Sequence, residues 1–117
     1  MNSIASTTIF SAGDLVRAPF PHVERPVLVP RPALVVSRTA LGPNGILTWT
    51  LMITNAEREL WPGDIAIPDS EKLGLLIPSK VRTAKIAPIE THRASLIGRL
   101  DDTTLAKVRE TLLASLG

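Results

Sequence analysis

Ten prolines are spread along this chain of 117 residues, and they restrict its fold more than any other feature does. A proline inside a helix removes a backbone hydrogen bond and clashes with the turn before it. The chain between Pro19 and Pro88 is therefore expected to form short strands joined by turns. The prolines stand at positions 19, 21, 26, 30, 32, 43, 62, 68, 78 and 88.

Apolar and β-branched residues between these prolines predict four strands, at residues 15–19, 33–38, 48–54 and 80–87. In the third of these, the side chains alternate, with Trp49, Leu51 and Ile53 on one face. Residues 42–45 form a tight turn, and a further short strand can follow the turn within residues 60–68. Residues 20–30 are expected to form a loop, because their prolines cannot join a central ladder.

The end of the chain has a different pattern. Asp102 and Thr103 can cap a helix, and residues 91–97 can form a short helical turn. Leucine or valine follows at helical spacing at positions 105, 108, 112 and 116. Short strands followed by one terminal helix predict a mainly β (α+β) fold, a small barrel with helical additions.

The length fits a single domain over residues 1–117, in which residues 1–11 can form a flexible N-terminal extension. The chain has no cysteine, which excludes disulfides and thiol nucleophiles and favours the cytosol. The apolar runs are too short to span a bilayer, so no membrane segment is expected. The N-terminus has no basic segment and no long apolar stretch, so no secretory signal is expected either.

The charges are unevenly distributed although the net charge is only +2. Residues 25–56 and 72–89 contain no acid, and each window carries several arginines or lysines. Such windows can form a positive face for a polyanion. Ordinary solvated surface charge explains them equally well.

The sequence lacks the residues that several kinds of functional site require. His22 and His92 are the only histidines, and neither has the spacing of a metal site, so no metal is expected. Glycine-rich nucleotide loops are absent, so no nucleotide cofactor is expected. The arginine, lysine, threonine, serine and histidine that remain suit phosphate chemistry without a metal.

Arg31 and Thr54 stand at the ends of two predicted strands. The planar fork of Arg31 suits a phosphate, and the hydroxyl of Thr54 can donate to a phosphate oxygen. A surface arginine at a strand end, and a threonine that caps a turn, are the simpler interpretations when each residue is taken alone.

Ser79, Lys80 and Arg82 place a hydroxyl beside two cations that share one face of a strand. They can bind an RNA backbone or form a solvated strand face. His22 can titrate near neutral pH and either contact RNA or act as a base, although a histidine in a loop is more often plain surface.

Taken in order, these segments resemble the MazF/PemK family of toxins. The matching segments are GDLV at 13–16, PFP at 19–21, RPALVVS at 31–37, ITN at 53–55, SKVR at 79–82 and IGRL at 97–100. The resemblance implies an SH3-like β-barrel with a C-terminal α-helix. It also implies a homodimer that acts as a sequence-specific endoribonuclease without a metal or cofactor and is blocked by a cognate antitoxin.

By motif position, Arg31 is similar to the family's catalytic arginine and Thr54 to its catalytic threonine. Arg82 resembles a second basic residue of the plasmid-borne branch, which pairs it with an aspartate two residues on, where this chain has Ala84. The expected reaction is attack of the ribose 2′-OH on the adjacent phosphorus, which restricts the substrate to RNA. His22 and an arginine are both candidates for the base. The rival hypothesis is a non-catalytic toxin or binding module on the same barrel, such as a gyrase poison or a nucleic-acid-binding domain.

Overall fold

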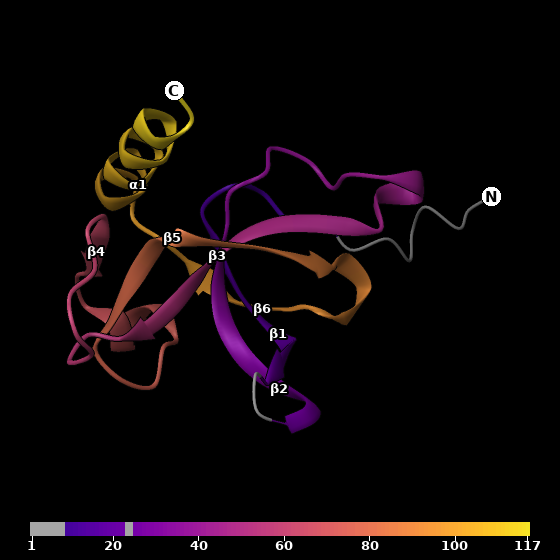
Figure 1. Ribbon diagram of the computed structural model, residues 1–117, viewed down its shortest axis with the longest axis horizontal. Coiled ribbons are helices and arrows are strands. Elements are labelled where there is room, and N and C mark those ends of the chain that lie inside the picture. The colour runs from indigo at the N-terminus through magenta and orange to yellow at the C-terminus, as the bar shows by residue number, and fades with distance from the viewer. Residues whose placement is uncertain (1–8, 23–24) are drawn as a thin grey trace.

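Six antiparallel strands form one sheet in the order β4-β5-β3-β2-β1-β6 (Figure 1). The computed structural model describes residues 9–22 and 25–117, and the side chains of 21–28 lie outside this description. The strands are β1 (Asp14–His22), β2 (Arg25–Val35), β3 (Leu47–Asn55), β4 (Asp64–Ile67), β5 (Ser79–Glu90) and β6 (Ser95–Arg99). Short 3-10 helices span Pro43–Gly45, Ser70–Leu73 and Thr91–Arg93, and the helix α1 spans Asp102–Ser115.

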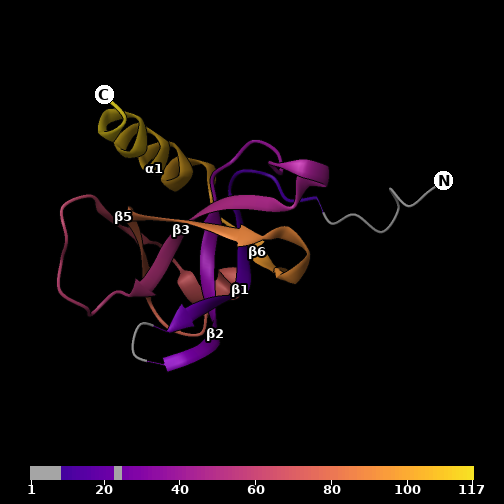
Figure 2. The ribbon, with the colours of Figure 1, turned by 45° about the vertical axis from the view of Figure 1, so that its right-hand side comes forward.

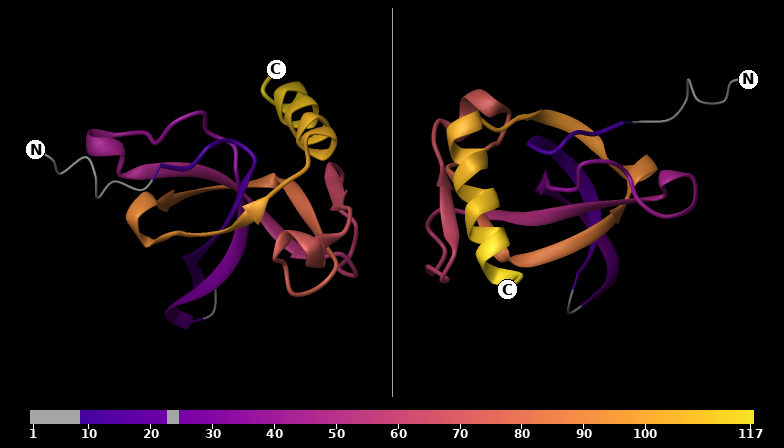
Figure 3. Two further views of the ribbon diagram at one scale, coloured as in Figure 1. Left: turned by 180° about the vertical axis from the view of Figure 1, so that it is seen from behind. Right: turned by 90° about the horizontal axis from the view of Figure 1, so that it is seen from above.

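The sheet curls strongly, as the two views of Figure 3 show, and it stays open between its edge strands β4 and β6. A bulge contributes to the curl, because Leu51 of β3 pairs with Ile86 of β5 whereas Met52 pairs with Arg82. The mainly β fold with a C-terminal helix is therefore confirmed, as an open half-barrel.

Apolar residues pack on both faces of the sheet. Leu15 and Leu34 belong to one buried cluster, which includes Val108 of α1. Their neighbours Val16 and Val35 point to the opposite face and belong to a second cluster. This is the period-two alternation of a strand with both faces covered.

The N-terminal extension predicted for residues 1–11 lies largely outside the description, since residues 1–8 are not described. Phe10 is buried in the second apolar cluster, and the backbone N–H of Ser11 donates to Asp14. Phe10 is therefore packed in the fold, and the exposed Ser11 is held by its hydrogen bond to Asp14. Over residues 9–22 and 25–117, no helix is both long and apolar enough to cross a membrane.

The loop predicted for residues 20–30 is wrong, because β1 and β2 continue as a two-stranded ribbon through much of this region (Figure 2). Pro19 pairs with Pro30 in that ribbon. β3 pairs with β2 only at residues 33–35, and β6 pairs with β1 only at residues 14–17. The prolines of this ribbon therefore lie beyond the β2–β3 ladder and the β1–β6 ladder. A proline has no backbone N–H to donate, and at these positions no outer strand needs that hydrogen bond.

The predicted alternation in β3 holds only in part. Trp49 is 51% exposed, whereas Leu51 and Ile53 are buried. Thr48 and Thr50 are buried instead, and both hydroxyls are hydrogen bonded, that of Thr50 to the carbonyl of Ala87 at 2.8 Å. The faces of β3 still alternate, because Leu51 and Ile53 belong to the first apolar cluster and Met52 packs against the second. Trp49 belongs to neither cluster, which leaves it exposed, and hydrogen bonds allow the two threonines to be buried.

The terminal elements are close to those expected. Helix α1 is capped by Asp101, whose carboxylate accepts the backbone N–H of Thr104 at 2.9 Å, one residue before the predicted cap. Within residues 91–97, the 3-10 turn ends at Arg93 and β6 follows. The β6 strand was not expected from the sequence.

Candidate active site

A pocket of about 370 Å³ opens beside the strands β1, β2 and β3 and the segment that leads into β5. Its polar lining consists of Arg17, Arg31, Thr54, Asn55, Arg58 and Ser79. Leu75, Leu76 and Ile77 form an apolar side, and Leu76 is 80% exposed. The pocket therefore combines guanidinium groups with an aliphatic wall, and its volume lies within the usual range of small-ligand sites.

Arg31 and Thr54 both stand just past the end of the β2–β3 ladder. Ala33 of β2 pairs with Met52 of β3 in the last pair of that ladder, and Arg31 and Thr54 each stand two residues beyond it along their strands. The two residues that the sequence singled out as catalytic candidates line one pocket.

Three arginines give the pocket a positive charge, and none of the described residues that line it is a carboxylate. Among the described residues, Arg17, Arg31 and Arg58 form no ion pair. Arginine keeps its proton at all ordinary pH values. A pocket of this kind favours an anion that carries several acceptor oxygens, such as a phosphodiester.

Ser79 also lines the pocket, but its hydroxyl is already engaged. The Oγ of Ser79 donates to the carbonyl of Ile77 at 2.7 Å, and its backbone N–H donates to Ser70 Oγ at 3.0 Å. Both bonds fix the segment before β5. Ser79 therefore shapes the apolar side of the pocket, with the lone pairs of its Oγ left as acceptors.

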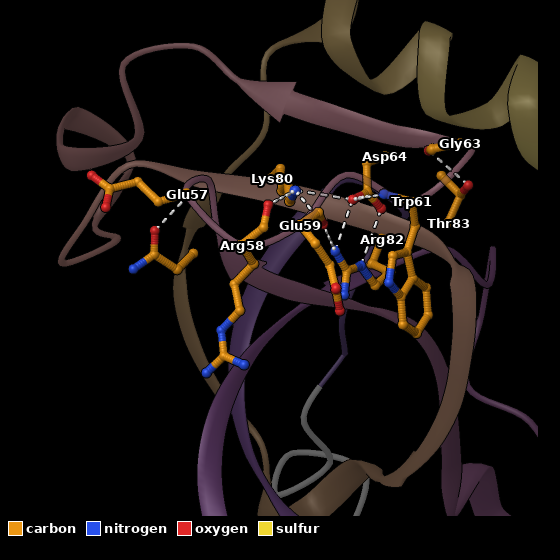
Figure 4. Close-up of polar contacts among 10 residues, drawn as sticks. Glu57, Arg58, Glu59, Trp61, Gly63, Asp64, Lys80, Arg82 and Thr83 are labelled. Carbon is orange, nitrogen blue, oxygen red and sulfur yellow. Dashed lines mark hydrogen bonds and ion pairs between the residues drawn. The ribbon is translucent and has the colours of Figure 1, made fainter.

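Lys80 and Arg82 do not line the pocket. The structure buries them to 4% and 6% exposure against the carboxylate of Asp64, which is 1% exposed (Figure 4). Arg82 forms a fork on Asp64, from Nε to Oδ1 at 3.2 Å and from Nη2 to Oδ2 at 2.9 Å, and Lys80 Nζ lies 3.1 Å from Oδ2. The solvated strand face, one of the two interpretations of these residues, is wrong, because Asp64 and the backbone carbonyls of Arg58 and Glu59 bind both cations.

Arg82 pairs with the carboxylate of Asp64, whereas the resemblance placed the partner carboxylate at position 84, which is Ala84 in this chain. It lies on β4 opposite Arg82 in the β4–β5 register, far from the expected place along the chain. Burial raises the pKa of Asp64, but hydrogen bonds from Arg82, the Trp61 N–H and Lys80 outweigh it and lower the pKa to about 2. The Trp61 ring stacks on Arg82, with 4.0 Å between the guanidinium carbon and the ring centre.

His22 lies near the tip of the ribbon, where its backbone pairs with Arg25. Its side chain is outside the described residues, so its predicted contact with RNA stays a prediction. No group of three or more metal-ligating side chains comes together in the described part of the chain.

Three polar residues of the pocket were not singled out from the sequence. Arg17 is an arginine inside an otherwise apolar strand, and that contrast was an available signal. Arg58 sits between Glu57 and Glu59, so it looked like part of an ordinary charged turn. Asn55 begins that turn, since its Oδ1 accepts the backbone N–H of Glu57 at 2.8 Å.

Comparison with known proteins agrees with this geometry. Residues 11–116 match the family described as PemK-like, MazF-like toxin of type II toxin–antitoxin system. A search of curated proteins by sequence gave no match.

Solved structures match over nearly the whole chain. The MazF of Deinococcus radiodurans is 26% identical with a TM-score of 0.73, and the match covers 94% of this chain and 98% of that one. The same organism's MazE–MazF complex matches at 25% identity and a TM-score of 0.72, covering 94% and 97%. A mycobacterial endoribonuclease in complex with its cognate antitoxin shares the fold at 18% identity and a TM-score of 0.72, covering 92% and 95%.

Proposed function

Because this chain belongs to the PemK-like, MazF-like toxins of type II toxin–antitoxin systems, an endoribonuclease family, we propose that its arginine-lined pocket cleaves single-stranded RNA without a metal. The observation that carries the proposal is the convergence of Arg31 and Thr54 in one pocket whose described lining includes three arginines and no carboxylate. We also propose that cleavage is sequence-specific and takes place in the cytoplasm.

The proposed reaction is a transesterification. The 2′-oxygen forms a bond to the adjacent phosphorus and the bond to the 5′-oxygen breaks, which leaves a 2′,3′-cyclic phosphate and a 5′-hydroxyl. Arg31 and Thr54 stabilise the negative charge that gathers on the phosphate oxygens in the transition state. The proton of the 2′-OH passes to a base, and the 5′-oxygen takes up a proton from the protonated base or from water as it leaves. His22 and an arginine of the pocket are the two candidates for the base, and His22 is chemically the easier one, because an arginine gives up its proton only under strong perturbation.

We expect the purified protein to cleave long RNA equally well with and without EDTA, because the pocket supplies cations of its own. Analysis of the products should find 2′,3′-cyclic phosphate ends. The control substrate is an all-2′-deoxy strand of the same sequence, which should stay intact because it lacks the nucleophile. Loss of activity in EDTA, or equal cutting of the deoxy strand, would contradict the mechanism.

The rival is a non-catalytic toxin or binding module on the same barrel. It would bind its partner and leave RNA intact in this assay. A pocket lined by both Arg31 and Thr54 favours the enzyme over a gyrase poison, whose binding surface does not require these residues. A nucleic-acid-binding domain would bind RNA through the same pocket, and the cleavage assay distinguishes it from the enzyme.

We propose that the chain forms a homodimer and that an acidic segment of a cognate antitoxin binds it. The positive pocket and the exposed Leu76 beside it offer such a segment both charge and apolar contact. Light scattering at micromolar concentration should give the mass of a dimer. The product of a neighbouring gene should inhibit cleavage, and a stable monomer or a failure of every neighbour to inhibit would count against these partners.

A further inference from the structure

We propose that Arg58 is a phosphate-binding residue of the pocket, and that Lys80 and Arg82 are positioning residues that place it and do not contact RNA. This inference rests on the proposed function, since it assigns further roles around the same pocket. The proposal depends on a set of hydrogen bonds that two buried cations donate to the backbone carbonyls of Arg58 and Glu59.

The segment 56–63 between β3 and β4 has no regular secondary structure, so its path depends on such bonds. At its start, the backbone N–H of Arg58 donates to the carbonyl of Asn55 at 3.0 Å. At its end, the N–H of Trp61 donates to Asp64 Oδ2 at 3.0 Å. Between these two anchors, buried donors on β5 hold the carbonyls of the segment.

Lys80 uses all three of its donors within the protein. Its Nζ donates to the carbonyl of Arg58 at 2.7 Å and to that of Glu59 at 3.0 Å, and it lies 3.1 Å from Asp64 Oδ2. An ammonium group has three N–H bonds and no more. Lys80 therefore has no donor left for a phosphate, and at 4% exposure it has no open path to one.

Arg82 supports the same segment. Its Nη2 donates to the carbonyl of Glu59 at 2.7 Å as well as to Asp64, and the Trp61 ring covers its guanidinium. Two buried cations share the single carboxylate of Asp64, so the two carbonyls supply the remaining acceptors. Buried cations need such partners, and this need fixes the backbone at residues 58 and 59.

The side chain of Arg58 then leaves this cluster for the pocket. In Figure 4 its guanidinium extends away from Lys80, Asp64 and Arg82. It lines the pocket together with Arg17, Arg31 and Thr54. A third guanidinium at this place suits a second phosphate oxygen or a neighbouring phosphate of the RNA chain.

The test measures binding to a labelled 2′-O-methyl oligoribonucleotide of mixed sequence, which lacks the 2′-OH and cannot be cleaved by the proposed reaction. Arg58→Ala should weaken the Kd about tenfold and reduce the slope of log K against log salt by about one, as the loss of one phosphate contact requires. The matched control is Arg109→Ala, an exposed arginine of α1 outside the pocket, which should change neither value.

A double-mutant cycle separates positioning from direct contact. Lys80→Met should weaken binding as much as Arg58→Ala does, and the double variant should be no weaker than either single one. Additive losses, with a slope reduced by about two, would show that Lys80 binds RNA itself and would overturn its positioning role. If Lys80→Met does not fold, the same cycle is measured with Arg82→Gln. This substitution removes the hydrogen bond from Arg82 to the Glu59 carbonyl and leaves Lys80 paired with Asp64.

Unchanged affinity in Arg58→Ala would overturn the assignment of Arg58. The proposed function fails separately, when the wild-type protein binds this probe and yet leaves ordinary RNA uncut. A wild-type protein that does not bind the probe at all would overturn both proposals.

Discussion

Arg31→Ala is expected to lower the single-turnover rate of RNA cleavage about a hundredfold and to leave the fold intact. A guanidinium aimed at the charge that develops on phosphorus is worth on the order of 3 kcal/mol in the transition state. Arg31 is exposed at the mouth of the pocket, so its loss removes little from either apolar cluster. Binding of RNA should fall much less than cleavage, because Arg17 and Arg58 remain in the pocket.

Three comparison variants sharpen this experiment. Arg31→Lys should restore little, because a point charge cannot replace the planar fork. Thr54→Ala should also slow cleavage, since it removes the hydroxyl on the neighbouring strand. Arg38→Ala is the control, because Arg38 is exposed and lies outside the pocket a few residues along the chain. An Arg31→Ala variant that melts normally and still cleaves at nearly the wild-type rate would place the reaction elsewhere.

Asp64→Ala is expected to destabilise the protein by about 3–5 kcal/mol, the range typical of breaking a buried ion pair. The substitution leaves Lys80 and Arg82 buried without a carboxylate. In a domain of this size the loss should lower the Tm by more than about 10 °C. Glu110→Ala on the exposed face of α1 removes the same charge and should stay within about 0.5 kcal/mol of wild type.

Lowering the pH should remove the stabilisation that the ionised Asp64 provides. The pKa of Asp64 is about 2 in the folded protein and 3.8 for the free group, so the ionised form is favoured by folding. Its contribution, about 2 kcal/mol, is fully present above pH 3.8 and is lost as the pH falls through about 2. Urea unfolding of Asp64→Asn across this range should lack that loss. A variant that loses stability in parallel with wild type would contradict the role of Asp64.

The sequence alone determined the kind of fold and half of the site. The spread of prolines between residues 19 and 88 disfavoured α-helices there, and the apolar spacing after residue 101 predicted one. Arg31 and Thr54 were recognisable as candidates because each is a polar residue at the end of an apolar stretch of the sequence, although β2 itself continues past Arg31 to Arg25. Local rules of this kind depend only on neighbouring residues, so a sequence is sufficient to apply them.

The tertiary structure decided which charged side chains are available to a ligand and which are paired within the protein. Lys80 and Arg82 looked like a solvated strand face, and only the pairing of β4 with β5 buried them against Asp64. Arg58 looked like an ordinary turn residue, and only the path of its segment brought it to the pocket. A charge is free or engaged according to partners that lie far along the chain, and strand pairing chooses those partners. The pairing depends on register, on one bulge and on the curl of the whole sheet, and no short stretch of sequence determines these.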